Sequence, residues 1–363
     1  YGFNEPFAAL SPNAASWLAS SYRAEIDQAL SAAGHIPGPL VFAHNSADFS
    51  KGLAGSTSSP RFSNGYGDVR HLPTILVENH SLKPYRQRVL GTYVLLEHSL
   101  KLLNEQGKAL IMARQADMNA RPQRMVLSYK ASEQPDFIDF KGMRYEIKQS
   151  EISGASYVHW TGEPKLYPQL PLYWDKVADN EVAIPKAFWL GPEQQTVLAR
   201  LKLHGIELTV LDKSQEVTLQ QVSVKAYQFA DKPFEGRFML HSASFNRSNV
   251  SRTLPAGWVK VSTDQPLGRL AVALLAPGAP DSFFSWGFFP GMFERTEYFE
   301  PYAIEPLIAR MLTEQPELKQ QFEQALAQDE ALRNNPRERY NWFYRQMPYY
   351  DQQYLKYPVL LEP

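Results

Sequence analysis

The sequence contains no cysteine, almost no net charge and no long apolar run. Without cysteine, the 363-residue chain forms no internal disulfide and no thiolate metal site. Its 37 basic and 38 acidic residues nearly cancel, so the chain as a whole lacks the positive charge typical of proteins that bind nucleic acid or anionic membranes. No apolar stretch approaches the roughly 20 residues of a transmembrane helix. We therefore expect a globular protein without a membrane span or a nucleic-acid partner.

The chain also begins without a leader pattern. Its first ten residues, YGFNEPFAAL, include no initiator methionine, charged n-region or apolar h-region. This start predicts either a removed leader or a chain that begins partway through a larger protein. Hydrophobic residues form 44% of the sequence, enough for a sizeable core, and the length suggests roughly two domains.

The first part of the sequence alternates helix and strand patterns, with Ser11-Pro12 as a helix start and Gly34 as a helix end. In order, we expect a helix over 13–33, a strand over 39–43, a long loop over 46–66, a strand over 73–78 and a helix over 84–106. The last helix carries Val89, Tyr93, Leu96 and Leu100 along one face, with Gly107 beyond its end.

The pattern changes from about residue 130. Short alternating segments appear, among them FKGMRYEIKQSE, VTLQQVSVKAYQF and WVKVST, separated by turn residues, and these predict a β-sandwich-like unit. A helix over 192–203 interrupts the strands, LGRLAVALLA forms an apolar segment, and 305–334 is helical and charged. The boundary falls between Ala120 and Lys130. The fold class is thus an α/β domain over 1–125 followed by a β-rich domain over 126–363 with added helices.

One carboxylate lies where a catalytic base is often found. In TILVENHSLKPYRQRV an apolar strand ends abruptly in Glu78. The end of a strand commonly presents functional side chains, and a glutamate there can act as general base towards a water when a metal or another electrophile lies within reach. The alternative is a surface carboxylate that caps the basic segment beyond it.

Four further side chains around Glu78 are candidates for substrate binding. Tyr66, in the glycine-rich RFSNGYGD, could close over a cleft, or it could anchor its loop to the core. His80, Lys83 and Arg86 could pair with a substrate carboxylate or orient the base. Otherwise these three form a solvated basic edge.

The segment from His204 to Glu207 satisfies the H-x-x-E spacing that zinc carboxypeptidases use for two metal ligands. Here, however, His204 follows the predicted helix, Gly205 occupies the position typical of a helix C-terminal glycine, and ELTVL follows as a strand. We interpret this segment as structural. No other H-x-x-E and no H-E-x-x-H occurs, so the chain contains no recognisable set of three zinc ligands.

With these residues in view, the sequence resembles the bacterial zinc carboxypeptidase family (carboxypeptidase A-like). The segments that carry the resemblance are SPRFSNGYGDVRHLPTILVENHSLKPYRQRVLGTYVLLE, PKAFWLGPEQQTVLARLKLHGIELTVL, DQPLGRLAVALLAPGAPDSFFSWGFFPGMFERTEYFE and the closing YPVLL. They match the end of the catalytic domain and the C-terminal extension of such proteins. In this family a strand-end glutamate is the general base for a zinc-bound water, and Glu78 matches it. Tyr66 is the nearest match to the tyrosine that closes over the substrate.

The resemblance implies a metallocarboxypeptidase, a hydrolase of C-terminal peptide or related amide bonds that uses zinc as cofactor and is periplasmic or secreted. The family's metal ligands and its carboxylate-binding arginine precede the matched region, so the chain is expected to lack the zinc-binding half and to be inactive alone. Its expected partners are a peptide or peptide-like substrate, a second copy of itself or an N-terminal fragment of the same protein. The alternative function is a non-catalytic binding or scaffold module that retains the peptidase fold.

Overall fold

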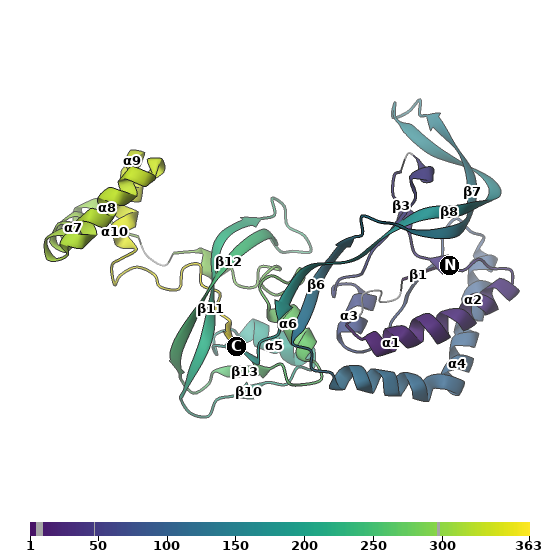
Figure 1. The fold of residues 1–363 in the computed structure, drawn as a ribbon, viewed down its shortest axis with the longest axis horizontal. Helices are drawn as coiled ribbons and strands as arrows, with labels where there is room; N and C mark the ends of the chain where they lie inside the picture. The colour runs from purple at the N-terminus through teal and green to yellow at the C-terminus, as the bar shows by residue number, and fades with distance from the viewer. Residues whose placement is uncertain (5–9, 47, 296–297) are drawn as a thin grey trace.

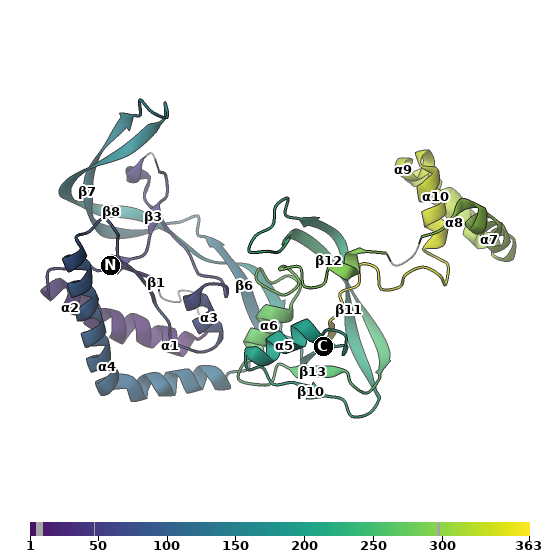
Figure 2. The same cartoon turned by 180° about the vertical axis from the view of Figure 1, so that it is seen from behind.

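The computed structural model describes residues 1–4, 10–46, 48–295 and 298–363. The chain is elongated, with an N-terminal unit at one end, a six-stranded β-sheet in the middle and a group of helices at the other end (Figure 1). A long two-stranded segment leads from the first unit to the second, and the view from behind shows the same order (Figure 2). Among the described residues, no helix combines the length and apolar character needed to cross a membrane. This is a mixed α/β architecture with several separate sheets.

The N-terminal unit is a small sheet with helices packed on one face. The sheet has the order β2-β1-β5, in which β1 pairs parallel with β2 and antiparallel with β5. Its strands and helices are β1 (Gly2–Asn4), α1 (Pro12–Trp17), a π-helical turn (Leu18–Tyr22), α2 (Arg23–Ala32), β2 (Gly38–Pro39), β5 (Leu76–Glu78) and α4 (Tyr85–Asn119). Phe3 from the sheet, Ile26 and Leu30 from α2 and Leu95 from α4 form the buried core of the unit.

The predicted helix over 13–33 is confirmed, although a π-helical turn divides it into α1 and α2. The helix predicted over 84–106 also exists, but its predicted end is wrong. Gly107 lies inside α4, which continues to Asn119. One glycine costs a helix only about 1 kcal/mol, and the following KALIMARQADMN is rich in residues that favour helix.

Two predictions for the segment before β5 are wrong. The strand over 39–43 is divided between β2 and β3 (Phe42–Ala43), which belong to different sheets. The loop over 46–66 contains a 3₁₀ turn (Phe49–Lys51), β4 (Leu53–Gly55) and the start of α3 (Ser63–Val69). Ring and strand contacts with distant residues hold these short elements: Phe49 packs on the ring of Tyr167, and Leu53 pairs with Leu172.

A second sheet joins the two parts of the chain. It has the order β3-β4-β8-β6, with β7 paired to β8, and its new strands are β6 (Arg124–Ala131), β7 (Asp136–Gln149) and β8 (Ser156–Ala183). The 28-residue β8 pairs with β4 from the first hundred residues and with β6 and β7 from beyond residue 123. This sheet therefore contains strands from both sides of residue 125.

The third sheet forms the centre of the molecule. Its order is β10-β13-β9-β14-β11-β12, with strands β9 (Ala187–Leu190), β10 (Thr209–Val210), β11 (Gln215–Phe229), β12 (Leu240–Leu254), β13 (Val259–Ser262) and β14 (Leu360–Glu362). The predicted helix over 192–203 is confirmed as α5 (Gln195–Leu203), and LGRLAVALLA forms α6 (Gly268–Leu275). Both helices pack with the sheet in the largest hydrophobic cluster. The β-sandwich expectation is corrected here, because the apolar α6 buries this face in place of a second sheet.

The predicted helical tail is present as four helices: α7 (Pro301–Glu314), α8 (Pro316–Gln328), α9 (Glu330–Asn334) and α10 (Pro336–Tyr344). A short 3₁₀ turn, Pro290–Phe293, precedes them. Their apolar faces form a cluster of their own around Ile304, Ile308 and Phe343. After α10 the chain returns to the central sheet, where β14 pairs with β9 and β11.

A buried carboxylate fixes the start of α1. Ser11 makes no side-chain cap at this helix. Asp117, fully buried near the end of α4, instead accepts hydrogen bonds from the backbone N–H groups of Asn13 (3.1 Å) and Ala14 (2.9 Å) and from the Asn13 amide (2.7 Å). The first N–H groups of a helix have no partner within the helix, so Asp117 acts as a distant N-cap.

We predict that Asp117→Ala lowers the free energy of unfolding by about 3 kcal/mol, because it leaves buried donors without an acceptor. Urea unfolding followed by circular dichroism measures this change. Asp27→Ala is the matched control, since Asp27 forms an i,i+4 ion pair with Arg23 and its side chain is 40% exposed, in contrast to the fully buried Asp117. Equal effects of the two substitutions would contradict the capping role.

Candidate functional site

Glu78 occupies the position predicted for it. It is the last residue of β5, where it pairs with Gly2 of β1, and its side chain is exposed. Within the described residues β5 is the last strand of its sheet, so its outer edge has no strand partner. Glu78 thus lies at the end of a strand whose outer edge has no strand partner among the described residues.

The three basic candidates follow Glu78 without converging on it through any described contact. The Nδ1 atom of exposed His80 accepts a hydrogen bond from the N–H of Leu82 at 3.2 Å. The Lys83 ammonium lies 5.1 Å from the centre of the Tyr1 ring, a cation–π contact. Arg86 is exposed at the start of α4. Their roles in substrate binding remain predictions.

Tyr66 contacts the second part of the chain. It lies on α3, and its hydroxyl is 2.7 Å from Nδ1 of His204 and receives a hydrogen bond from Arg70 at 3.1 Å. Burial and the guanidinium groups of Arg70 and Arg200 lower the pKa of His204, which favours its neutral form. These contacts favour the interpretation of Tyr66 as an anchor between α3 and α5.

The H-x-x-E segment has the structural geometry that the sequence predicted. Helix α5 ends in a C-cap at His204, and Gly205 has a φ of 81°, the left-handed conformation typical of a helix end. The backbone N–H of Glu207 donates to the side chain of Gln265, and the Glu207 carbonyl accepts from it. The strand that follows is only the two-residue β10. His204 and Glu207 are therefore held by separate partners.

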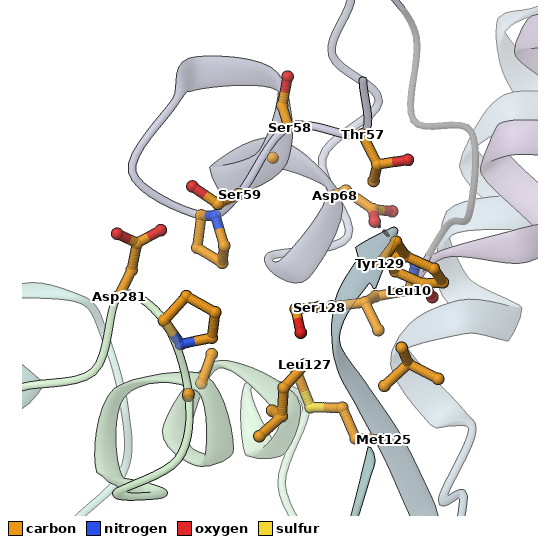
Figure 3. A pocket seen from close by; sticks show the side chains of 16 residues that line it. Leu10, Thr57, Ser58, Ser59, Asp68, Met125, Leu127, Ser128, Tyr129 and Asp281 are labelled. Carbon is orange, nitrogen blue, oxygen red and sulfur yellow. Dashed lines mark hydrogen bonds between the residues drawn. The ribbon is translucent and has the colours of Figure 1, made fainter. Parts of the chain in front are cut away.

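A cavity lies where the N-terminal unit meets the second sheet. Its volume is about 190 Å³. It is lined by the segments 57–60, 125–129 and 279–281 and by side chains from α3 and α6. Asp68 and Tyr129 lie on one side and Asp281 on the other (Figure 3). The carboxylate of Asp281 accepts from the N–H of Arg61 at 3.3 Å and the indole of Trp286 at 3.4 Å.

Asp68 is the main electrostatic feature of this cavity. Its carboxylate accepts hydrogen bonds from the backbone N–H groups of Leu10 (2.7 Å) and Ser11 (2.9 Å). Burial raises the pKa of Asp68 to about 6, against the opposing effect of these bonds and of the Arg269 guanidinium. The carboxyl group therefore gains and loses its proton close to neutral pH.

His71 and Ser11 lie next to Asp68 but do not form a catalytic triad. The Ser11 hydroxyl is 2.8 Å from Nδ1 of His71 and donates to the backbone carbonyl of Asp68 at 2.6 Å. Both side chains are almost fully buried, and the Asp68 carboxylate contacts backbone N–H groups in place of the imidazole. Burial, with the nearby Arg269, lowers the pKa of His71 to about 4. The Ser11–His71 pair is therefore buried and uncharged at neutral pH, and it does not present a nucleophile and base to a substrate.

Asp68 and His71 were not predicted from the sequence, and Ser11 was predicted only as a helix start. The sequence contains one local indication of this buried polar group. Asp68 and His71 follow two glycines in SNGYGDVRH. A side chain on Gly65 would collide with the Ser58 and Ser59 carbonyls, and one on Gly67 would collide with Thr74. These glycines let α3 approach its neighbours closely, and this brings Asp68 against the turn that precedes α1.

Comparison with protein-family models, curated proteins and solved structures finds no match to this chain. The resemblance to zinc carboxypeptidases therefore remains a prediction from the sequence.

We predict opposite pH effects from Asp68 and His71. The folded state holds the Asp68 proton more tightly, so this group's contribution to stability is lost as pH rises from about 4 through 6. The folded state resists protonating His71, so its contribution is lost as pH falls from about 6.5 towards 4. Each contribution is on the order of 3 kcal/mol, and in the wild type the two oppose each other between pH 4 and 6.

Single substitutions separate these effects. The unfolding free energy of Asp68→Asn should fall as pH is lowered from 6.5 to 4, whereas that of His71→Gln should rise. Urea unfolding at several pH values measures both slopes, and the slope is informative even though each substitution changes stability overall. Parallel slopes for the two variants would show that these groups do not titrate as described.

Proposed function

We propose that this chain supplies the C-terminal part of a zinc-dependent, carboxypeptidase-like hydrolase in which Glu78 is the general base. The observation that carries the proposal is the position of Glu78, exposed at the end of β5 on an open sheet edge. A base must reach the water that it deprotonates, and an exposed strand end permits this. The resemblance of the surrounding sequence to the family supports the same assignment.

The described residues do not by themselves fit the metal. No group of three or more His, Asp or Glu side chains within them is arranged to hold an ion. A catalytic zinc takes about three protein ligands, so these ligands would have to come from a segment outside this chain. For this reason the proposed role of the chain is limited to its own groups: Glu78 accepts a proton from the attacking water and delivers it to the leaving amine.

The open edge of β5 indicates how such a segment would attach. A strand at a sheet edge has unpaired backbone N–H and C=O groups, and a neighbouring strand satisfies them. A strand added beside β5 would also bring its own side chains next to Glu78. The proposed active site would therefore lie between this chain and the added strand.

In the proposed enzyme the second part of the chain packs against the catalytic unit. Trp286, Phe288 and Phe289 lie in the aromatic segment SFFSWGFFPGMFERTEYF, whose side chains could either pack against the catalytic unit or bind extended substrate. Phe289 is buried, and the guanidinium of Arg61, from the N-terminal unit, lies 5.4 Å from the Trp286 ring centre. The Arg237 guanidinium covers Phe288 at 3.7 Å. These contacts favour packing over substrate binding.

In the intact parent protein, Glu78→Gln should reduce kcat by roughly 10²- to 10⁴-fold while zinc stays bound, because glutamine is nearly isosteric but cannot accept the proton. Release of C-terminal amino acids from peptides, together with metal analysis, provides the measurement. Glu207→Gln, in the H-x-x-E segment, is the matched control and should keep both activity and zinc. Near-normal turnover by Glu78→Gln would remove Glu78 as the base.

The 363-residue chain alone should hold no tightly bound zinc and release no C-terminal amino acids. Metal analysis and a peptide hydrolysis assay of the purified chain test this expectation. One equivalent of zinc that survives His204→Ala, together with hydrolysis, would reveal a complete site within this chain. A parent protein that binds no zinc and is inactive would instead support a scaffold module.

A further inference from the structure

Helix α4 has an apolar stripe on the face opposite its packed face. Towards the core of the N-terminal unit, α4 buries Gly91, Leu95 and Leu102, which pack near α1 and α2. On its other side five large apolar residues remain between 42% and 69% exposed: Val89, Tyr93, Leu96, Leu100 and Leu103. We call these five residues the α4 stripe. A helix normally buries its apolar stripe, so this surface requires a partner.

The spacing of the α4 stripe indicates the shape of that partner. Successive residues of the stripe lie four, three, four and three positions apart. This alternating spacing is typical of a helix that packs lengthwise against another helix, as in a coiled coil. At about 1.5 Å per residue, the stripe extends along roughly 21 Å of α4. A second helix with the same spacing would cover it, whereas a strand would follow a different period.

The flanks of the α4 stripe are mostly uncharged. Thr92, Ser99 and Gln106 lie on one side, and Leu90 and Asn104 lie on the other. The charged residue among these flanks is Glu97, whose carboxylate is bound by Lys101 of the same helix at 2.7 Å. Two copies of the stripe can therefore face each other without like-charge repulsion. A symmetric dimer requires a surface that is complementary to itself in this way.

We propose that the α4 stripe binds the α4 stripe of a second copy of this chain in antiparallel orientation. The orientation follows from Arg86, which lies three residues before Val89 on the same face of α4 and is exposed. A parallel pair would bring the two Arg86 guanidinium groups together, whereas an antiparallel pair places each of them beside Gly107 and Leu110 of the other helix. This inference is independent of the proposed hydrolase activity.

The 4–3 spacing also gives a register. In antiparallel packing Leu96 meets Leu100 of the second copy, and Tyr93 meets Leu103 of the second copy. The two Leu96–Leu100 layers form the centre, with a tyrosine–leucine layer on each side. Two copies of Tyr93 then lie about 15 Å apart along the helix axis, a separation that distinguishes this arrangement from a parallel pair.

Analytical ultracentrifugation of the 363-residue chain tests whether it dimerises. We expect a dimer, and we expect Leu96→Glu with Leu100→Glu to raise its dissociation constant by roughly 100-fold or more, because four leucines leave the interface. Glu105→Lys, an exposed charge change on another face of α4, is the matched control and should leave the dimer intact. Circular dichroism should be unchanged in both variants, since the substituted side chains are exposed.

Disulfide cross-linking tests the orientation of the two helices. Because the native chain contains no cysteine, every disulfide forms between introduced cysteines. In an antiparallel dimer, Tyr93→Cys and Leu103→Cys form no disulfide separately but form one when the two variants are mixed, since bridged Cα atoms lie within about 7 Å. In a parallel dimer each variant links to itself and the mixture forms no heterologous link. Glu105→Cys should not link in either arrangement.

Three outcomes would overturn the proposal. The first is a monomeric wild-type chain. If Leu96→Cys in that monomer also resists alkylation, the stripe is covered by a segment of the same chain. The second is a dimer that is unaffected by the double glutamate substitution, which would place the interface elsewhere. The third is self-linking of Tyr93→Cys, which would establish the parallel orientation.

Discussion

The position of the N-terminal unit depends on how the turn before α1 satisfies its backbone hydrogen bonds. The N–H groups of Leu10 and Ser11 donate to Asp68 of α3, and those of Asn13 and Ala14 donate to Asp117 of α4. The guanidinium of Arg269, on α6, donates to the carbonyls of Leu10 and Asp117. Elements from three distant parts of the sequence thus converge on one turn. Because buried donors without acceptors are costly, these contacts fix how the N-terminal unit meets α6, which packs on the central sheet.

The same convergence explains the unusual electrostatics of the junction. Asp68, Asp117 and Arg269 are all largely removed from water, so each needs its partners. Burial raises the pKa of Asp68 despite the hydrogen bonds that it accepts from two backbone N–H groups, and burial lowers the pKa of the neighbouring His71. The cavity beside Asp68 lies where α3, β6 and α6 approach one another without filling the space. Its polar lining follows from the way in which the two units are joined.

What could be predicted from the sequence depended on local signals. The helix start at Ser11-Pro12, the left-handed Gly205 and the strand end at Glu78 each have a signal in the neighbouring sequence, and each was predicted correctly. By contrast, Asp117 caps a helix more than one hundred residues earlier in the sequence, and no local pattern marks it. The short strands β3 and β4 exist through pairing, β3 with β4 and β4 with the distant β8. Their sequence is compatible with a loop when it is considered alone.

Helix α4 shows a further limit of sequence periodicity. The pattern of Val89, Tyr93, Leu96 and Leu100 predicts one apolar face, yet the packed face of α4 contains Leu95 and Leu102. Periodicity shows that a face is apolar, but it does not tell whether the same chain or another chain covers it. The open edge of β5 presents a different requirement, because it exposes backbone hydrogen-bonding groups in place of apolar side chains. A helix satisfies the first requirement and a strand satisfies the second, so these two surfaces need different neighbours.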